Sequence, residues 1–431
     1  MKYSFFMRSA IAICFLVIVS CNQKITDTSS RPIRPTVDLS GKTLTGASVL
    51  AFGANNVLFI GDSKASKVYA IPTTAKAVKD PVPFNNFGID RKIAIALGVS
   101  SSDLIINDMQ IHPVSQEAYI AFKNGHAPNA KSLIAVISPT NNNVRFLDLT
   151  NAEKQQVSLK EPHTEGFNFY RDLPSSTLNI TDIDYLDGFI YVAGLTNGEF
   201  ASTLRKIKYP FDGNQSKVAS IEMYHAVHTQ NETRAPIRTM TFEEINGEST
   251  LIAAYTCTPL VSIPTSDINE GNHVKAKTIA ELGFGNTPID MITFMAQEQD
   301  GSFDKKLLIT NKQRSASLIS LKDFTKANEG KGMDSGFTMG PEGVNIFPVP
   351  MAGVMQISDQ NQMMLSVLRR NMDTGAVDLI SKMKGAYFRL SDFASEYEFP
   401  EFTHRDGDPW FDYQNAMKQM EGFPELMKTK Q

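Results

Sequence analysis

Short apolar runs recur along this chain in a fixed order. The runs PIRTMTF (236–242) and PIDMITF (288–294) align without a gap, and ITDIDY (180–185) and INDMQI (106–111) fit the same frame, with weaker copies in ASVLAF (47–52) and VMQISD (354–359). Two further apolar runs follow each of these six, beginning near residues 57 and 67, 118 and 132, 189 and 202, 251 and 259, 306 and 317, and 363 and 376. Apolar runs of this length between polar turns predict β-strands, so we expect a three-strand unit repeated six times.

A fourth apolar run completes some of these units, for example VRFLDL (144–149) and AYFRL (386–390). Repeats of about forty to fifty residues with three or four strands are typical of a β-propeller, whereas a two-sheet sandwich would not need one strand order six times. We therefore predict an all-β fold, a β-propeller of six blades over residues 42–392. Seven blades is the alternative, if the irregular stretch 151–178 hides a degenerate copy.

The first repeat, VLAFGANNVLFIGDSKASKVYAI (49–71), resembles an NHL-type or YVTN-type propeller repeat. It has an apolar strand, an Asn-rich turn, a strand that ends in Gly-Asp and a Lys-Val-Tyr strand. The resemblance implies the architecture of residues 42–392 and no particular activity, because one propeller fold carries many functions.

Two segments depart from the repeat. Residues 89–99, IDRKIAIALGV, place apolar side chains at helical spacing and predict a short helical insertion between the first two repeats. From residue 393 the chain becomes acidic and aromatic, with Trp410 before an amphipathic stretch at 413–420. We predict that residues 393–431 form a C-terminal tail packed on or beside the propeller, with partner docking as the alternative.

The N-terminal segment predicts export. Lys2 and Arg8 accompany an apolar run, 9–19, that is shorter than the roughly twenty residues needed to span a bilayer. Residues 18–21, Ile-Val-Ser-Cys, resemble the bacterial lipoprotein signature, which implies cleavage of a signal peptide, 1–20, and lipidation of Cys21 by a fatty acid such as palmitate. Residues 21–41 are polar and predict a flexible tether. Asn22 after the cysteine favours the outer membrane over the inner, with the domain facing the periplasm or the cell exterior.

The cysteine count and the net charge indicate how the domain is stabilised and which partners it does not suit. Without residues 1–20, Cys257 is the one cysteine besides Cys21, so the predicted domain has no internal disulfide. Its stability must then come from a hydrophobic core, which a chain with 42% hydrophobic residues can form. The chain has 42 Lys and Arg against 46 Asp and Glu, a net charge of -4. This acidic balance argues against nucleic acid as a partner.

Strand direction predicts which loops share a face. In a four-stranded meander, the turn between the second and third strands lies on the same face as the crossover into the next blade. The crossover MYHAVHTQNETRAP (223–236) and the turn 256–258 therefore belong to one rim, which is our candidate binding face. The predicted rim residues are His126, His225, His228, Arg234, Arg238, Cys257, Arg369 and Arg370. The starts of the innermost strands place Asn107, Thr181 and Asp290, together with Arg238, at the mouth of a central channel.

His225 and His228 raise the question of a metal site. The alternation of VASIEMYHAV predicts a strand, in which residues three apart point to opposite faces, so the two histidines would not chelate one ion. A helical turn would let them share a face. A set from different blades, His126, His225 and Cys257, is the other candidate, because imidazole and thiolate suit zinc or copper. The alternative is polar rim residues that hydrogen-bond the crossover, and an Arg crown for an anion or Cys257 as a nucleophile are weaker hypotheses.

Three classes of function are compatible with these residues. The first is a lipid-anchored binding or scaffold propeller whose partner is a protein or a small anionic ligand on one face. The second is a propeller enzyme, resembling either the calcium-dependent lactonases of the SMP-30 group or a quinoprotein-like oxidoreductase subunit, although the channel-mouth residues supply the lactonase ligand set only in part. The third is an assembly component that docks at the aromatic tail. Catalytic residues and cofactors remain unassigned.

Overall fold

The computed structural model describes residues 38–427 except 75, 80–81, 153–154, 165, 167, 170–172, 213–216, 299, 393–395 and 400. These residues belong to one compact unit, Thr36–Gln431. The predicted signal peptide, Cys21 and most of the predicted tether lie outside the described residues.

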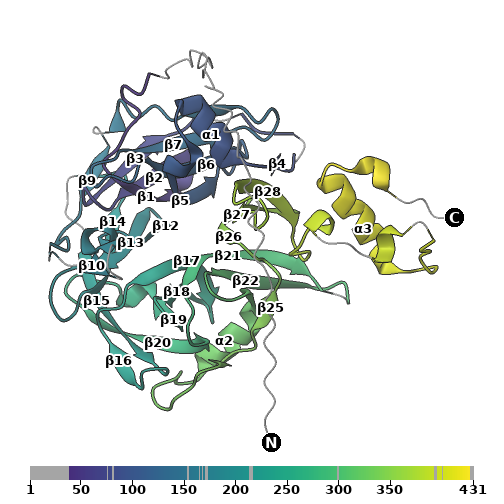
Figure 1. Cartoon of the computed structure of the whole chain (residues 1–431). Helices are drawn as coiled ribbons and strands as arrows, with labels where there is room; N and C mark the ends of the chain where they lie inside the picture. The colour runs from purple at the N-terminus through teal and green to yellow at the C-terminus, as the bar shows by residue number, and fades with distance from the viewer. Residues whose placement is uncertain are drawn as a thin grey trace, which may run out of the picture. The chain divides into compact units, whose positions relative to one another are not determined.

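Six innermost strands form a closed ring of neighbours. They are β1 (Ala47–Phe52), β5 (Leu104–Ile111), β12 (Asp182–Leu186), β17 (Ile237–Ile245), β21 (Pro288–Gln297) and β26 (Val354–Asp359). Around the ring β1 is followed by β12, β17, β21, β26 and β5, and β5 lies beside β1 again. Figure 1 shows these strands around the centre of the domain, with the rest of each sheet outside them. The prediction of an all-β propeller is therefore confirmed.

The second and third strands of every repeat are also where the apolar runs predict them. They are β2 (Val57–Asp62), β3 (Lys67–Pro72), β6 (Ala118–Asn124), β7 (Ser132–Ile137), β13 (Phe189–Leu195), β14 (Ser202–Lys208), β18 (Glu248–Tyr255), β19 (Pro259–Pro264), β22 (Phe303–Asn311), β23 (Ala316–Ser320), β27 (Met364–Arg370) and β28 (Val377–Met383). Every residue of β2 and of β7 is buried, which explains why these strands read as continuous apolar runs rather than alternating ones. The core is divided into clusters, two of which fill spaces between neighbouring sheets, while another lies between the two halves of one large sheet.

The number of separate sheets differs from the prediction. The described residues form four four-stranded sheets, one ten-stranded sheet and a two-stranded pair, β10 (Asn168–Phe169) with β11 (Leu173–Pro174). In the ten-stranded sheet two meanders join because β15 (Lys217–His225) pairs in parallel with β20 (His273–Leu282). The short strands β16 (Gln230–Glu232) and β24 (Pro341–Glu342) pair with β15 and β20. Six separate blades are thus not observed. The described part of residues 151–178 contributes β9 (Gln156–Ser158), β10, β11 and a 3-10 helix at Ser175–Leu178, and no seventh four-stranded sheet.

Two sheets take their outermost strand from a distant part of the chain. The predicted fourth strand at 386–390 is wrong, because β4 (Asn85–Asn86) already occupies that edge of β28, with Asn86 opposite Leu379. The outer strand of the β1–β3 sheet is β9, which follows the whole second repeat. The remaining outer strands are β8 (Val144–Phe146), shorter than its predicted run, and β25 (Phe347–Val349).

Three aspartates connect neighbouring innermost strands. Asp108 of β5 accepts a hydrogen bond from the backbone N–H of Leu50 in β1, at 2.6 Å. In the same way Asp182 binds the N–H of Met240 in β17 (2.7 Å), and Asp290 binds that of Ile357 in β26 (2.8 Å). Because the innermost strands of a propeller do not pair with one another as a ladder, these carboxylates supply direct hydrogen bonds between sheets.

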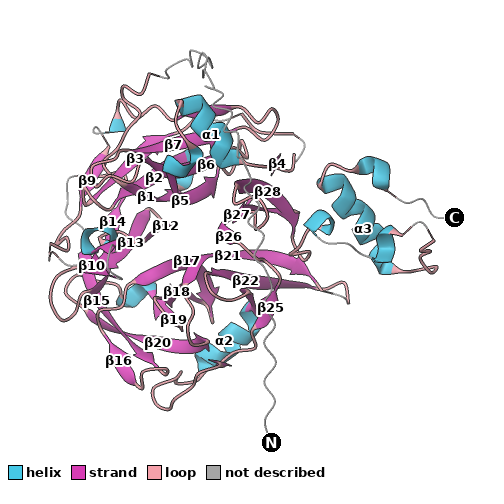
Figure 2. Ribbon diagram, in the orientation of Figure 1, coloured by secondary structure: helices cyan, strands magenta, loops and turns pink. Residues whose placement is uncertain are grey.

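Helices are few and lie outside the sheets (Figure 2). They are α1 (Ile89–Leu97), which confirms the predicted insertion, α2 (Leu321–Glu329), which the sequence did not predict, and α3 (Pro409–Met420). Short 3-10 helices occupy connections: η1 (Ala54–Asn56), η2 (Ser101–Asp103), η4 (Ser175–Leu178), η5 (Thr265–Asp267), η6 (Leu390–Asp392), η7 (Glu396–Glu398) and η8 (Pro424–Leu426). Among the described residues, no helix has the length and apolar character needed to cross a membrane.

The insertion and the C-terminal segment both contact the last sheet. The N–H of Gly88, just before α1, donates to Asp378 of β28 (2.9 Å), and Asp90 accepts from the N–H of Val377 (3.1 Å). After α3, the Glu421 carboxylate accepts hydrogen bonds from the N–H groups of Leu390 (2.6 Å) and Ser391 (2.9 Å). The insertion is thus bonded directly to β28, whereas the C-terminal segment reaches this sheet through β4, where the Asn85 side chain donates to the carbonyl of Met420 (2.8 Å).

Candidate functional site

The crossover that carries the two histidines is a hairpin rather than a continuous strand. Strand β15 ends at His225, and β16 returns along it with His225 opposite Gln230. Between them a tight turn is closed by hydrogen bonds from the N–H of His228 to the carbonyl of His225 (3.1 Å) and from Thr229 to Ala226 (3.3 Å). The prediction that a strand separates the two histidines onto opposite faces is wrong, because this turn brings residues three apart to one side.

Both histidines consequently face the same carboxylate. His225 Nδ1 lies 3.1 Å from Glu232 Oε1, and His228 Nδ1 is hydrogen-bonded to that same oxygen. The two imidazole centroids are 4.1 Å apart. One nitrogen of each histidine and an oxygen of Glu232 lie within 4.8 Å of one another. We refer to His225, His228 and Glu232 as the His225 cluster.

A second layer of buried polar groups fixes the ring of His225. Its Nε2 lies 3.0 Å from the hydroxyl of Thr258, in the turn between β18 and β19. That hydroxyl donates its proton to Glu281 of β20, and the other oxygen of Glu281 accepts from the N–H of Ala226 (2.7 Å). His225, Thr258 and Glu281 are fully buried. Because the Thr258 proton is committed to Glu281, Thr258 accepts a hydrogen bond from Nε2–H, which leaves Nδ1 directed at Glu232.

The electrostatics of the cluster follow from these contacts. Burial by itself lowers the pKa of His225, but hydrogen bonding with the Cys257 thiol and with Glu232 raises that pKa to about 9. Burial raises the pKa of Glu232, whereas the hydrogen bonds from His225 and His228 bring it down to about 2. Burial raises the pKa of Glu281. Near neutral pH His225 is therefore protonated, and its Nδ1–H faces the ionised carboxylate of Glu232.

Cys257 lies in the same turn as Thr258. It is half-buried, and its φ of 80° is in the left-handed region that non-glycine residues rarely adopt. Backbone strain of this kind is concentrated at functional sites. Adjacent residues of this turn thus both interact with His225: the Cys257 thiol helps to raise its pKa, and the Thr258 hydroxyl lies 3.0 Å from its Nε2.

His126 does not join this group. It is exposed in the turn between β6 and β7, where its Nε2 lies 2.8 Å from the carbonyl oxygen of Ser102. Its sheet begins with β5, whose neighbours in the ring are β1 and β26, whereas Cys257 belongs to the meander that begins with β17. The set of His126, His225 and Cys257 is therefore not assembled.

The predicted rim arginines are also dispersed. Arg369 forms a two-pronged ion pair with Asp392, one bond of which is 2.8 Å, and Arg370 donates to the carbonyl of Gly375 (2.8 Å). Both lie at the end of β27, in a sheet that is not adjacent to that of Arg238. Arg234 is exposed on the crossover near the His225 cluster. No crown of four arginines forms.

The residues predicted at the channel mouth lie in innermost strands or directly before them, and three of them bond to backbone groups. Asn107 donates to the carbonyl of Ala47 (2.7 Å), Thr181 pairs through its N–H with Ala193 (2.9 Å), and Arg238 occupies a register shift between β17 and β18. Both carboxylate oxygens of Asp290 accept backbone N–H groups, from Ile357 and Met291. Burial raises the pKa of Asp290 well above its usual range, and the charge of Asp108 adds to the effect.

Sequence reasoning missed three members of the arrangement around His225. Glu232 lies four residues after His228, a spacing at which side chains can meet on a turn. Thr258 is adjacent to the Cys257 that the sequence did single out. Glu281, within the apolar run of β20, has no local signal, because its role depends on pairing between β19 and β20.

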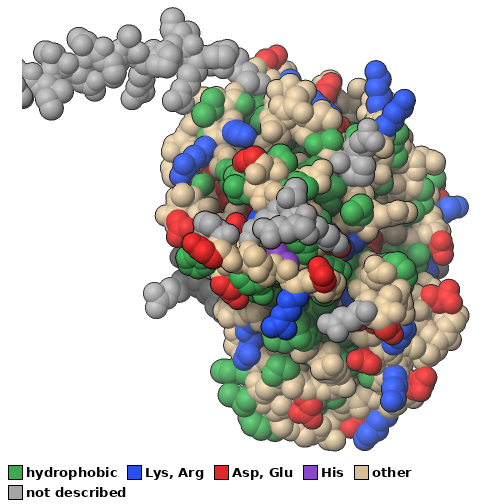
Figure 3. Space-filling model, turned by 90° about the vertical axis from the view of Figure 1, so that its right-hand side faces the viewer, with side chains coloured by type: hydrophobic (Ala, Val, Ile, Leu, Met, Phe, Trp, Pro, Cys, Tyr) green, Lys and Arg blue, Asp and Glu red, His purple; other side chains and the backbone are tan. Residues whose placement is uncertain are grey.

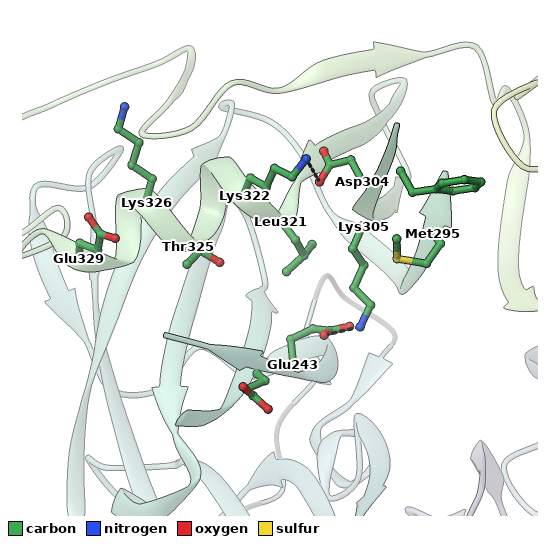
Figure 4. Close-up of a pocket in the computed structure, with 11 residues that line it drawn as sticks. Glu243, Met295, Asp304, Lys305, Leu321, Lys322, Thr325, Lys326 and Glu329 are labelled. Atoms are coloured by element: carbon green, nitrogen blue, oxygen red, sulfur yellow. Dashed lines mark hydrogen bonds and ion pairs between the residues drawn. The ribbon is translucent and has the colours of Figure 1, made fainter. Parts of the chain in front are cut away.

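Two cavities lie away from the His225 cluster. Figure 4 shows a cavity of about 740 Å³ between β17, the start of β22 and α2. Four of its charged groups form ion pairs, since Lys305 bonds to Glu243 (2.7 Å) and Lys322 lies 3.7 Å from Asp304. A second cavity of about 320 Å³ is lined by residues such as Lys160, Asn197 and Phe200. Neither cavity includes a member of the His225 cluster.

The surface shows no extended basic area on the face drawn in Figure 3. Positive and negative side chains alternate there, with hydrophobic side chains between them. The mixture of charges on this face is consistent with the net charge of -4 of the whole chain.

No protein-family model and no curated protein matches this chain. Among solved structures it is similar to extracellular domains 1–2 of Drosophila Semaphorin 1b, at 8% identity and a TM-score of 0.35, over 78% of this chain and 84% of that one. Semaphorin 1a from Drosophila gives 9% identity and a TM-score of 0.34, over 81% and 88% of the two chains. The PQQ-bound form of aldose sugar dehydrogenase from Streptomyces coelicolor gives 8% identity and a TM-score of 0.27, over 79% and 95%. TM-scores this low carry no argument about activity.

Proposed function

We propose that this chain is a lipid-anchored extracytoplasmic β-propeller that acts as a binding module, with its ligand site on the rim around the His225 cluster. The observation that supports the proposal is the interlocked pair of loops at this position. The β15–β16 hairpin and the β18–β19 turn are held together by the hydrogen bonds from His225 through Thr258 to Glu281. Polar groups fixed in this way on the loops of a rigid scaffold are typical of a binding site.

An enzyme with its site at the central axis has weaker support. The carboxylates that a lactonase-like site would need are Asp108, Asp182 and Asp290, and each accepts one hydrogen bond from the neighbouring innermost strand and one from the following residue of its own. Carboxylates occupied in this way hold the ring together. A quinoprotein-like role has no residue-level support in the described part of the chain.

The number of blades is also part of this proposal. We infer that the ten-stranded sheet consists of two blades joined through β15 and β20, because each half is a four-stranded meander that begins at the ring. Six blades then surround the axis. The fusion fixes the two meanders that contribute His225 and Thr258 relative to each other.

The location in the cell envelope depends on Cys21. A protein anchored there by lipid would hold the propeller outside the cytoplasm, with the outer membrane favoured by Asn22. Cys21→Ala should abolish incorporation of a labelled fatty acid and release the protein from the membrane fraction or block its maturation. An unlabelled and fully soluble wild-type protein would contradict the anchoring.

The binding face is tested with a photo-crosslinking amino acid introduced into the full-length protein in its native host. Arg234 is exposed on the proposed rim, and Asn246, exposed in the turn between β17 and β18, is the matched position on the opposite face of the same meander. We expect one reproducible adduct from position 234 and none from position 246. Equal adducts from both positions, or none from 234, would count against a binding rim.

A further inference from the structure

We propose that His225, His228 and Glu232 bind one divalent transition-metal ion of the Zn²⁺ class through two imidazole nitrogens and a carboxylate oxygen. This assignment rests on the proposed binding rim and names the ligand chemistry of that site. The three residues come from one hairpin, so no movement of blades is needed to bring them together.

The separations suit a small ion. Zinc binds imidazole nitrogen and carboxylate oxygen at about 2.0–2.2 Å, so two ligands of a tetrahedral site are about 3.3 Å apart. His225 Nδ1 and Glu232 Oε1 are 3.1 Å apart, close to that edge length. His228 is 48% exposed, so its side chain has room to adjust its own nitrogen to the ion. All three donor atoms already lie within 4.8 Å of one another.

The buried second layer prepares His225 for a cation. Metal-bound histidines almost always donate their other ring N–H to an oxygen that fixes the ring and its tautomer. Thr258 provides this acceptor for Nε2–H, and its own proton is directed to Glu281. The lone pair of Nδ1 then points at the Glu232 carboxylate, an arrangement that is repulsive unless a cation lies between them. A metal ion between His225 Nδ1 and Glu232 Oε1 would satisfy both groups.

The donor set also limits which ion fits. Calcium takes six to eight oxygen ligands and magnesium prefers octahedral oxygen sites, whereas two imidazoles and one carboxylate suit Zn²⁺ and its neighbours. Glu232 is 15% exposed and His228 faces solvent, so the ion is reachable and a further coordination position is open. That position is available to water or to a donor group of the bound partner.

The test is metal titration of the full-length protein in mild detergent after removal of bound metal. We expect one Zn²⁺ per chain by calorimetry, and with Co²⁺ a visible absorption of a low-symmetry site. His228→Ala and Glu232→Gln should each weaken binding at least about ten-fold, in line with the loss of a primary ligand. His126→Ala, a rim histidine on a non-adjacent sheet, is the matched control and should leave the affinity unchanged. Absence of stoichiometric binding, or binding that His228→Ala does not weaken, overturns the proposal.

Two points keep this test separate from folding and from the broader function. His228 is half-exposed, so its substitution does not disturb the core, and circular dichroism of each variant checks the fold; His225 is left intact for this reason. If crosslinking at position 234 succeeds but no ion binds, the metal assignment fails and the binding rim stands. If an ion binds as expected but no partner is crosslinked, the metal assignment stands and the proposed partner binding fails.

Discussion

The hydroxyl of Thr258 lies 3.0 Å from Nε2 of His225, although the two residues are 33 positions apart and come from different meanders. Both are fully buried. The contact therefore connects two loops of the rim through a hydrogen bond that water cannot replace. Loss of this hydrogen bond should lower the free energy of unfolding.

Replacement of Thr258 by Val should lower the free energy of unfolding by about 1–3 kcal/mol, because it leaves His225 Nε2 and a Glu281 oxygen buried without their partner. Urea denaturation of the variant and the wild type gives the difference. Thr256→Val is the control in the same turn, since the Thr256 hydroxyl is part-buried and makes a longer bond, 3.3 Å, to the carbonyl of Pro236. An equal loss in both variants would mean that the turn, and not the contact with His225, determines the effect.

The carboxyl groups near the axis predict a pH dependence of stability. Burial raises the pKa of Asp108 and of Asp184 to about 7, against about 3.9 in an unfolded chain. Between these values the folded state binds more protons than the unfolded state, so the free energy of unfolding falls as the pH rises from about 4 to about 7. We expect a lower urea midpoint at pH 7.5 than at pH 5. Asp108→Asn should reduce this difference, and exposed Asp187→Asn should not.

The backbone of Cys257 gives a third prediction. With φ at 80°, glycine adopts this conformation at no steric cost, whereas a β-branched residue does not. Cys257→Gly should leave the free energy of unfolding within about 1 kcal/mol of wild type, and Cys257→Val should lower it by about 1–3 kcal/mol. Thermal denaturation distinguishes the two. Should Val be tolerated as well as Gly, the left-handed conformation would not be required at this turn.

The attachment of the C-terminal segment depends on Glu421. Its buried carboxylate accepts the N–H groups of Leu390 and Ser391, so Glu421→Gln removes one acceptor oxygen and should cost about 1–3 kcal/mol. We expect faster cleavage of the segment that contains α3 in limited proteolysis, with the strands of the sheets still protected. Exposed Glu425→Gln is the control and should digest like the wild type.

The sequence was most informative where structure is local and repeated. The three strands of each repeat could be predicted because burial leaves apolar runs of regular spacing, and α1 because its apolar residues follow a helical period. The edges could not be predicted in the same way. Asn85 and Asn86 form an outer strand that is two residues long and polar, and nothing nearby indicates that it pairs with Leu379 and Ile380.

In the candidate site, too, some features could be predicted from the sequence and others could not. The common face of the crossover and the β18–β19 turn could be inferred from strand direction, and in the structure His225 and Thr258 meet there. The relative orientation of His225 and His228 could not, because the strand pattern of VASIEMYHAV ends at His225 and the following turn depends on a tertiary contact, the bond from Ala226 to Glu281. A residue such as Glu281 enters the site only through its neighbour in the sheet.

The outer strands that come from distant segments, β4 and β9, affect the order in which this chain can fold. Asn85–Asn86 are synthesised early, but their partner β28 ends at Met383, so the edge remains open until almost the entire domain is available. Contacts of such long sequence separation slow folding, and open sheet edges invite association with other chains. The ring of sheets is therefore complete only when the sequence as far as β28 is available. Because β28 pairs with β4 and bonds to the start of α1, the domain is sensitive to truncation at its C-terminal end. Loss of β28 would release both α1 and β4.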